Sequence, residues 1–182
     1  NYSILMKNNI VFILGVLFLF SCAEKQARRP VTQKTATVLS ETIQLKKELI
    51  ASENKFIEDY IAKDTINTYF TSSFGFWYSY NSKKENEINS PKTGDEVTLE
   101  YNITDINNVV IYSKEELGIK KYTIDKEDFI LGLQEGLKLM KVGETITFVI
   151  PSYRAFGLIG DENKIGTNQT IKSTVTLLNI KH

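Results

Sequence analysis

Residues 128–144, which read DFILGLQEGLKLMKVGE, contain the pattern that decides the fold. Apolar residues recur there at intervals of three, four and three positions, at Ile130, Leu133, Leu137 and Met140. This spacing predicts one face of a short helix. Gly132 and Gly136 lie four residues apart inside that helix, where each glycine costs up to about 1 kcal/mol relative to alanine. A close approach of this helix to a sheet would explain both glycines.

Strand patterns lie on both sides of this helix. Alternating apolar residues and runs of β-branched or aromatic residues predict strands at 74–80, 96–104, 109–112, 120–124, 145–150 and 170–180. Turn residues separate several of these segments, as at 91–95, where Pro, Gly and Asp occur together. Many strands and one central helix predict an α+β fold over residues 73–182, with an antiparallel sheet curled around the helix.

The composition excludes several classes of protein. The 182 residues carry 22 basic and 22 acidic side chains, so no net positive charge is available for bulk binding of nucleic acid. One Cys and one His are too few for a disulfide, a Cys-based zinc site or a Ser-His-Asp triad. We therefore expect no metal site and no cofactor. Any reaction must require almost no proton transfer and no covalent nucleophile.

The first 21 residues have the features of an export signal. Residues 10–20 form the apolar run IVFILGVLFLF, which suits the centre of a signal peptide and is short for a membrane span. Leu19, Phe20 and Ser21 precede Cys22, an order that resembles the bacterial lipobox. The resemblance implies cleavage before Cys22 and its acylation. The mature chain would then be anchored to a bacterial membrane in the cell envelope, on the periplasmic or surface side. An ordinary secretory signal and a short anchor helix are the alternatives.

A tether and a helix are predicted between the signal and the strands. Residues 22–38 are polar and show no periodicity, which predicts a flexible tether. Residues 39–72 are expected to form a helical extension, in which Ser40 is a suitable N-cap and apolar residues recur on one face between 40 and 61. That face either packs on the chain's own domain or forms a contact with a second copy or another partner.

Four segments between residues 91 and 182 resemble the FKBP-type peptidyl-prolyl cis-trans isomerases, in the order and at the spacings of that family. The segments are GDEVTLEY (94–101), DFILGLQEGLKLMKVGE (128–144), IPSYRAFG (150–157) and TIKSTVTLLNI (170–180). The lipobox and the run VIYSKEEL (110–117) further resemble the gliding-motility-associated lipoproteins of this family. The resemblance implies the FKBP fold, isomerisation of the bond that precedes proline as the activity, and proline-containing polypeptides as partners.

This reaction suits a chain with so few catalytic side chains. Amide resonance opposes rotation about the prolyl bond with a barrier of about 18–20 kcal/mol. An apolar pocket that holds the proline ring, with one backbone donor on the preceding carbonyl, can bind the twisted amide better than either planar isomer. Neither a nucleophile nor a cofactor is needed.

The resemblance assigns the pocket residue by residue. Tyr101, Ile130 and Phe156 match the positions expected to act in catalysis, and the backbone N–H of Ile130 matches the family's donor to the substrate carbonyl. The other matching positions are expected to bind substrate, and they are Tyr112, Tyr122, Phe129, Leu133 and Ile165.

Several pocket positions depart from the family pattern. Leu133 replaces a Trp at the pocket floor, and Phe156 replaces a Tyr whose hydroxyl bonds the ligand. Tyr112 replaces the Asp that usually pairs with the hydroxyl of Tyr101. Gly166-Thr167 stands where the family has Pro-Pro, and Ser173 replaces an aromatic wall residue.

Two functions therefore remain open. One is a membrane-anchored isomerase that assists the folding of exported or cell-surface proteins, the gliding-motility machinery among them. The other is a non-catalytic FKBP-fold chaperone or assembly module, with the helix at 40–61 supplying a homodimer contact or a cradle for clients. The loop carboxylates at 161 and 162 have no visible partner in the sequence and are expected to be solvated surface.

Overall fold

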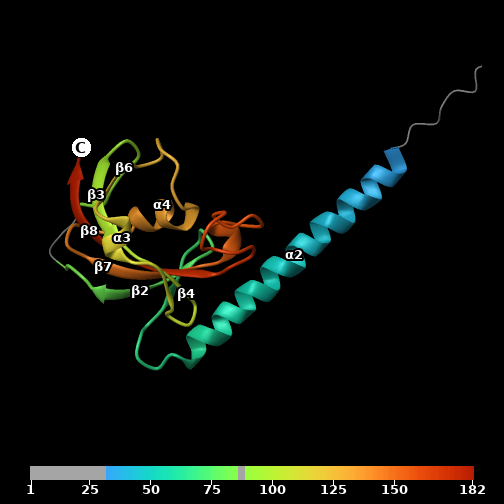
Figure 1. Cartoon of the computed structure of the whole chain (residues 1–182), viewed down its shortest axis with the longest axis horizontal. Coiled ribbons are helices and arrows are strands. Elements are labelled where there is room, and N and C mark those ends of the chain that lie inside the picture. The colour runs from blue at the N-terminus through green and yellow to red at the C-terminus, as the bar shows by residue number, and fades with distance from the viewer. Residues whose placement is uncertain (1–31, 86–88) are drawn as a thin grey trace, which may run out of the picture. The chain divides into compact units, whose positions relative to one another are not determined.

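The computed structural model describes residues 32–85 and 89–182 (Figure 1). The predicted export signal, the lipid anchor at Cys22 and the start of the tether lie outside the described residues and stay predictions. Of the described residues, those up to Thr42 and those from Ile43 to His182 belong to two different units. The second unit contains the end of helix α2 and every strand of the sheet.

Helix α2 (Thr32–Lys63) covers residues 39–63 of the predicted helical extension and also part of the predicted tether, whereas residues 64–72 are not helical. The N-cap predicted at Ser40 is wrong, because Ser40 lies inside the helix and its hydroxyl donates to the carbonyl of Thr37 at 2.8 Å. No glycine or proline interrupts residues 32–63, and Ala, Gln, Lys and Glu are all good helix formers. A segment without an apolar face can thus still extend a helix that is stabilised further along the chain.

A turn built on Asp64 follows helix α2. Asp64 Oδ1 accepts hydrogen bonds from the backbone N–H groups of Ile66 and Asn67 at 2.9 and 3.1 Å. The side-chain amide of Asn67 and then these two N–H groups lower the pKa of Asp64 to about 2. Strand β1 (Phe70–Thr71) comes next. This turn and strand β1 occupy the end of the segment 39–72 that was predicted to be helical.

In the described part of the chain, eight strands form one sheet in which every pair is antiparallel. The order is β1-β2-β7-β8-β3-β6, with β4 paired to β8 and β5 paired to β4. After β1, the strands are β2 (Trp77–Ser82), β3 (Glu96–Tyr101), β4 (Ile103–Asp105), β5 (Val110–Tyr112), β6 (Lys120–Thr123), β7 (Thr145–Ile150) and β8 (Ile171–Lys181). The strand predicted at 74–80 begins later, because Phe74 and Gly75 form a turn in which Gly75 has a φ of 80°.

The predicted central helix is α4 (Leu131–Leu137), and the sheet curves around it in Figure 1. A Cβ atom added to Gly132 would lie 2.6 Å from Cγ2 of Ile150, and one added to Gly136 would lie 2.6 Å from Cε1 of Phe148. Both contacts are with strand β7, so the close approach of helix and sheet that the two glycines predicted is confirmed. The α+β class, with an antiparallel sheet curled around one short helix after an N-terminal helix, is likewise confirmed.

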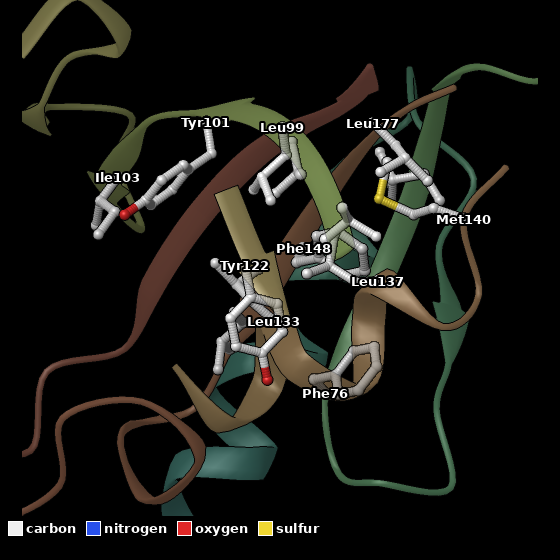
Figure 2. Close-up of a cluster of buried hydrophobic side chains, with 14 of the residues drawn as sticks. Phe76, Leu99, Tyr101, Ile103, Tyr122, Leu133, Leu137, Met140, Phe148 and Leu177 are labelled. Atoms are coloured by element: carbon white, nitrogen blue, oxygen red, sulfur yellow. The ribbon is translucent and has the colours of Figure 1, made fainter. Parts of the chain in front are cut away.

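The main core lies between α4 and the sheet (Figure 2). The predicted helical stripe supplies Leu133, Leu137 and Met140, all fully buried. They share this cluster with Phe76, Leu99, Tyr101, Tyr122, Phe148 and Leu177 from the strands and loops. Tyr101 and Ile103 lie at one edge of the labelled cluster in Figure 2, and this edge continues into the pocket described below.

A second, smaller core joins the end of α2 to the sheet. Ile57 is fully buried against Trp77 of β2 and Val149 of β7. Val149 alternates along β7 with Phe148 and Ile150 of the main core, so Ile57 packs on the sheet face opposite α4. The predicted apolar face of α2 is thus divided. Ile57 packs on the chain's own domain, whereas the side chains of Leu45, Leu49 and Phe56 remain 61%, 56% and 53% exposed.

Candidate active site

An open pocket of about 440 Å³ lies beside the start of helix α4. Its walls come from the end of β3, from β4 and β5, from helix α3 (Lys114–Leu117), and from the loops on either side. The lining residues are Tyr101, Ile103, Tyr112, Leu117, Asp128, Phe129, Ile130, Ala155, Phe156 and Asp161.

Five of the eight predicted site residues line this pocket together: Tyr101, Tyr112, Phe129, Ile130 and Phe156. The other three, Tyr122, Leu133 and Ile165, are buried in the adjoining core and do not line it. Leu133 lacks the reach of the Trp that it replaces, and it packs with the rest of the α4 stripe. These three residues support the pocket wall from behind.

The rear of the pocket is a wall of aromatic rings. Phe129 meets Tyr101 edge to face, with ring centroids 5.5 Å apart, and lies 5.1 Å from the ring of Tyr122. Aromatic pairs in such arrangements add about 0.5–1.5 kcal/mol beyond the area that they bury. Lys120 Nζ lies 5.1 Å from the centroid of the Phe129 ring. Because Tyr101 and Tyr122 belong to the main core, the position of Phe129 depends on the packing of the whole domain.

Ile130 occupies the N-cap position of α4, with φ −58° and ψ 119°. Its carbonyl accepts from the N–H groups of Leu133 and Gln134, each at 2.9 Å, which starts the helix. Among residues 32–85 and 89–182, no group accepts a hydrogen bond from the N–H of Ile130 itself. An unpaired N–H is expected where a helix begins. In this pocket it is available to a substrate carbonyl.

Tyr101 also carries an unused hydroxyl. No group in the described residues forms a hydrogen bond with this hydroxyl. This is expected, because Tyr112 occupies the position of the Asp that usually pairs with it, and the Tyr112 hydroxyl binds Asp161. Burial raises the pKa of the Tyr101 hydroxyl above its ordinary value. The group is therefore protonated at neutral pH and can donate to a bound peptide.

The mouth of the pocket is closed on one side by Tyr112. Its hydroxyl donates to Asp161 Oδ2 and accepts from Asn163 Nδ2 at 3.1 Å. Lys164 Nζ lies 4.6 Å from the centroid of the Tyr112 ring. These contacts, which we call the mouth contacts, join strand β5 to the loop before β8.

The prediction that Asp161 is solvated surface is wrong. Asp161 lines the pocket, and its Oδ1 accepts from the backbone N–H groups of Ile165 at 2.7 Å and Asn163 at 3.0 Å. Partial burial pushes the pKa of Asp161 upward, but the hydrogen bonds from Tyr112 and from these N–H groups outweigh it, so the pKa lies below its ordinary value. The same bond to Asp161, followed by burial, raises the pKa of Tyr112.

Sequence reasoning missed five of the lining residues, namely Ile103, Leu117, Asp128, Ala155 and Asp161. Ile103 continues the alternation of Val97, Leu99 and Tyr101, so its side of the strand was visible in the pattern. Asp161 carried no comparable signal, because Tyr112 lies 49 residues away in the sequence.

Neither a metal-binding cluster nor a membrane-spanning helix is found in the part of the chain that the structure describes. No three His, Cys, Asp or Glu side chains within it are grouped so as to hold a metal ion. Nor does any helix there have both the length and the apolar character that a membrane crossing requires.

The fold and the pocket agree with a family comparison. Residues 88–178, half of the chain, match the family model of the FKBP-type peptidyl-prolyl cis-trans isomerases. The chain belongs to this family of enzymes.

Individual relatives agree with that assignment. The probable FKBP-type peptidyl-prolyl cis-trans isomerase FkpA of Neisseria meningitidis is 34% identical over 125 residues, which are 69% of this chain and 44% of that protein. The outer membrane protein MIP of Legionella longbeachae is 34% identical over 91 residues, covering 50% of this chain and 39% of that protein. The chain thus spans less than half the length of these curated relatives.

Solved structures show the same arrangement. The crystal structure of FkpA from Escherichia coli has a TM-score of 0.60 and 26% identity, and covers 95% of this chain and 82% of that chain. A peptidyl-prolyl cis-trans isomerase from Pseudomonas syringae has a TM-score of 0.60 at 18% identity, covering 75% of this chain and 96% of that chain. The second match bears on the fold alone.

Proposed function

We propose that this protein is a membrane-anchored peptidyl-prolyl cis-trans isomerase that assists the folding of exported or cell-surface proteins. The observation that carries the proposal is the pocket at the start of α4, where an aromatic wall lies beside an unpaired backbone N–H. Membership of the FKBP-type family supports the same activity.

The pocket contains the groups that the reaction requires. The rings of Tyr101, Phe129 and Phe156 provide apolar surface for a proline ring, and the N–H of Ile130 can bond the carbonyl that precedes it. A twisted amide has lost its conjugation, and a site shaped for it binds it better than either planar isomer. Each 1.36 kcal/mol of such preference speeds isomerisation about tenfold.

The replacement of Tyr by Phe156 sets a limit on the rate. A phenylalanine ring keeps the apolar contact but cannot donate the hydrogen bond that the family's tyrosine supplies, a net loss of about 0.5–1.5 kcal/mol. We therefore expect an isomerase with a lower rate than a relative that retains the hydroxyl.

The location that we propose is the cell envelope. The apolar run at 10–20 and the lipobox-like order that ends in Cys22 support export and lipid anchoring. The name of one relative, an outer membrane protein, is consistent with such a location. The run VIYSKEEL at 110–117 and the lipobox support clients in the gliding-motility machinery.

A second candidate function rests on helix α2. Leu45, Leu49 and Phe56 leave large apolar side chains more than half exposed on it, which is the composition of a protein contact surface. This face supports a homodimer through the 40–61 helix, or a non-catalytic chaperone that holds clients there. Tyr112 at the pocket mouth favours the non-catalytic alternative, because a large ring there narrows access.

A peptide assay tests the isomerase proposal. The purified chain from Cys22 to His182 is added to Ala-Xaa-Pro peptides with varied Xaa, and the rate of cis-to-trans conversion is followed. We expect a rate above the uncatalysed exchange, which takes roughly 10–100 s. If the protein accelerates the conversion for no Xaa, the isomerase proposal is contradicted and the non-catalytic chaperone remains as the candidate function.

A further inference from the structure

Helix α2 contacts the pocket domain through one carboxylate as well as through Ile57. Glu53 Oε1 accepts from the backbone N–H of Ser152 at 2.6 Å and from the hydroxyl of Thr170 at 2.6 Å. Its Oε2 accepts from the hydroxyl of Ser152 at 2.8 Å. Ser152 and Thr170 are buried, so few water molecules can replace the carboxylate. Such bonds to a charged acceptor are stronger than neutral ones.

Ser152 is the first residue of the segment that brings Ala155 and Phe156 to the pocket. The 3-10 helix η2 (Ser152–Arg154) follows β7, and Ala155 and Phe156 come directly after it. The carbonyl of Ser152 accepts from the N–H groups of Ala155 at 2.9 Å and Gly157 at 2.8 Å. The two backbone bonds thus come from both neighbours of Phe156, and both are accepted by the carbonyl of Ser152, which Glu53 binds through the N–H and hydroxyl of that residue.

The neighbouring helix residue reinforces this attachment. Asn54 Oδ1 accepts from the hydroxyl of Tyr153 at 3.0 Å, so successive residues of α2 bind successive residues of η2. Ile57, one turn further on, is fully buried against Trp77 and Val149 and does not depend on these bonds. The helix can therefore remain packed when the Glu53 carboxylate is removed. The effect of Glu53 on the pocket can then be measured separately from the packing of the helix.

We infer that Glu53 is a positioning residue for the isomerase reaction, which fixes Ala155 and Phe156 against the substrate by binding Ser152. The inference rests on the proposed isomerase function. Helix α2 then does more than link the domain to its anchor, because it holds one wall of the pocket in place. Small displacements of groups that contact substrate are known to lower rates considerably.

Three substitutions at Glu53 separate position from charge. Glu53→Gln retains the length, and its amide oxygen can accept from the Ser152 N–H and Thr170 while its amide nitrogen donates to the Ser152 hydroxyl. Glu53→Asp keeps the charge but withdraws it by one methylene, and Glu53→Ala removes all three bonds. For kcat/KM of a prolyl peptide, we expect Gln to stay within about twofold of the parent, Asp to fall below Gln, and Ala to fall about 3- to 10-fold.

The matched control is Glu58→Ala. Glu58 is exposed on the same helix, and no hydrogen bond or ion pair to another described residue involves its side chain. It should leave kcat/KM unchanged. The emission of Trp77, the only tryptophan, reports whether Ile57 stays packed beside it. We expect parental emission in all four full-length variants, and amide NMR shifts in Glu53→Ala confined to residues near 53, 152–157 and 170.

The outcomes are distinct. An active parent with equal kcat/KM in Glu53→Ala overturns the inference and leaves the proposed function standing. An inactive parent overturns both before any variant is compared. If Glu53→Ala does not fold, the Gln and Asp variants decide, and an Asp variant equal to or faster than Gln overturns the positioning role. Lower activity accompanied by changed Trp77 emission would also overturn it, since a loosened helix would then be the cause.

Discussion

The rear wall and the mouth of the pocket are held in two different ways. The rear wall, formed by Tyr101, Phe129 and Ile130, is an extension of the core, because its rings and backbone pack on buried strand residues and on the first turn of α4. The mouth is held by side-chain bonds between Tyr112 and a surface loop. Damage to the wall should therefore cost stability and activity together, whereas damage to the mouth should change substrate access with little loss of stability.

The largest effect is expected at Tyr101, where wall and core coincide. Tyr101→Ala removes a buried ring that packs on Phe129, and large-to-small changes of this kind cost about 3–5 kcal/mol. Urea unfolding should show this loss, and the isomerisation rate of the remaining folded protein should fall about tenfold or more. A stable variant with the parent's rate would place the site elsewhere.

The second effect tests whether the wall depends on the approach of α4 to β7. Gly136→Ala would place a Cβ 2.6 Å from Phe148 Cε1, and such overpacking costs about 1–3 kcal/mol. We expect a lower free energy of unfolding and a moderate loss of isomerisation, as α4 and Ile130 shift. Gly94→Ala is the contrasting variant, because a Cβ there meets no atom within 4 Å and only its φ of 93° is unfavourable. A Gly136→Ala protein as stable as the parent would contradict the packing explanation.

The third effect concerns Phe156, which lines the pocket from the loop after η2 and belongs neither to the rear wall nor to the mouth contacts. Phe156→Tyr restores the hydroxyl that the family uses, and a net hydrogen bond of about 0.5–1.5 kcal/mol corresponds to a rate increase of about twofold to tenfold. Stability should change little, since Phe156 is only partly buried. A rate that stays the same would show that a substrate does not reach this position.

The smallest effect concerns the mouth and its pH dependence. The pKa of Asp161 lies below its ordinary value of 3.8, so its contribution to stability is complete above that pH and is lost as the pH falls through the lower folded-state value. Between pH 5 and pH 2 the melting temperature of the parent should fall more than that of Asp161→Asn. At neutral pH the variant should be less stable than the parent by the small contribution of Asp161, and this difference should shrink as the pH falls. Parallel curves of melting temperature against pH for the two proteins would show that the mouth contacts do not contribute to stability.

The sequence was informative where periodicity and packing decide the structure. The stripe at 130–140 and its two glycines predicted the helix and its contact with the sheet, and the family resemblance predicted half of the residues that line the pocket. Periodicity shows which face of a segment is buried, and the FKBP core is built from such faces.

The sequence was uninformative where single polar contacts decide the structure. Asp161 was predicted to be solvated surface and no role was predicted for Glu53, yet each binds groups far away in the chain, Tyr112 in one case and Ser152 in the other. A polar residue has no periodic signature for a partner that only the fold brings near. The early start of α2 was missed for a related reason, since helix propensity without an apolar face gives a weak pattern.

The central claim is that this pocket catalyses prolyl isomerisation instead of only binding proline-containing clients. Exchange NMR on a labelled Ala-Xaa-Pro peptide, with the protein's own amide spectrum recorded in the same sample, tests it most directly. We predict faster cis-trans exchange together with shifts at Ile130 and its pocket neighbours. Shifts at Ile130 without faster exchange would contradict catalysis, and faster exchange without those shifts would contradict the site.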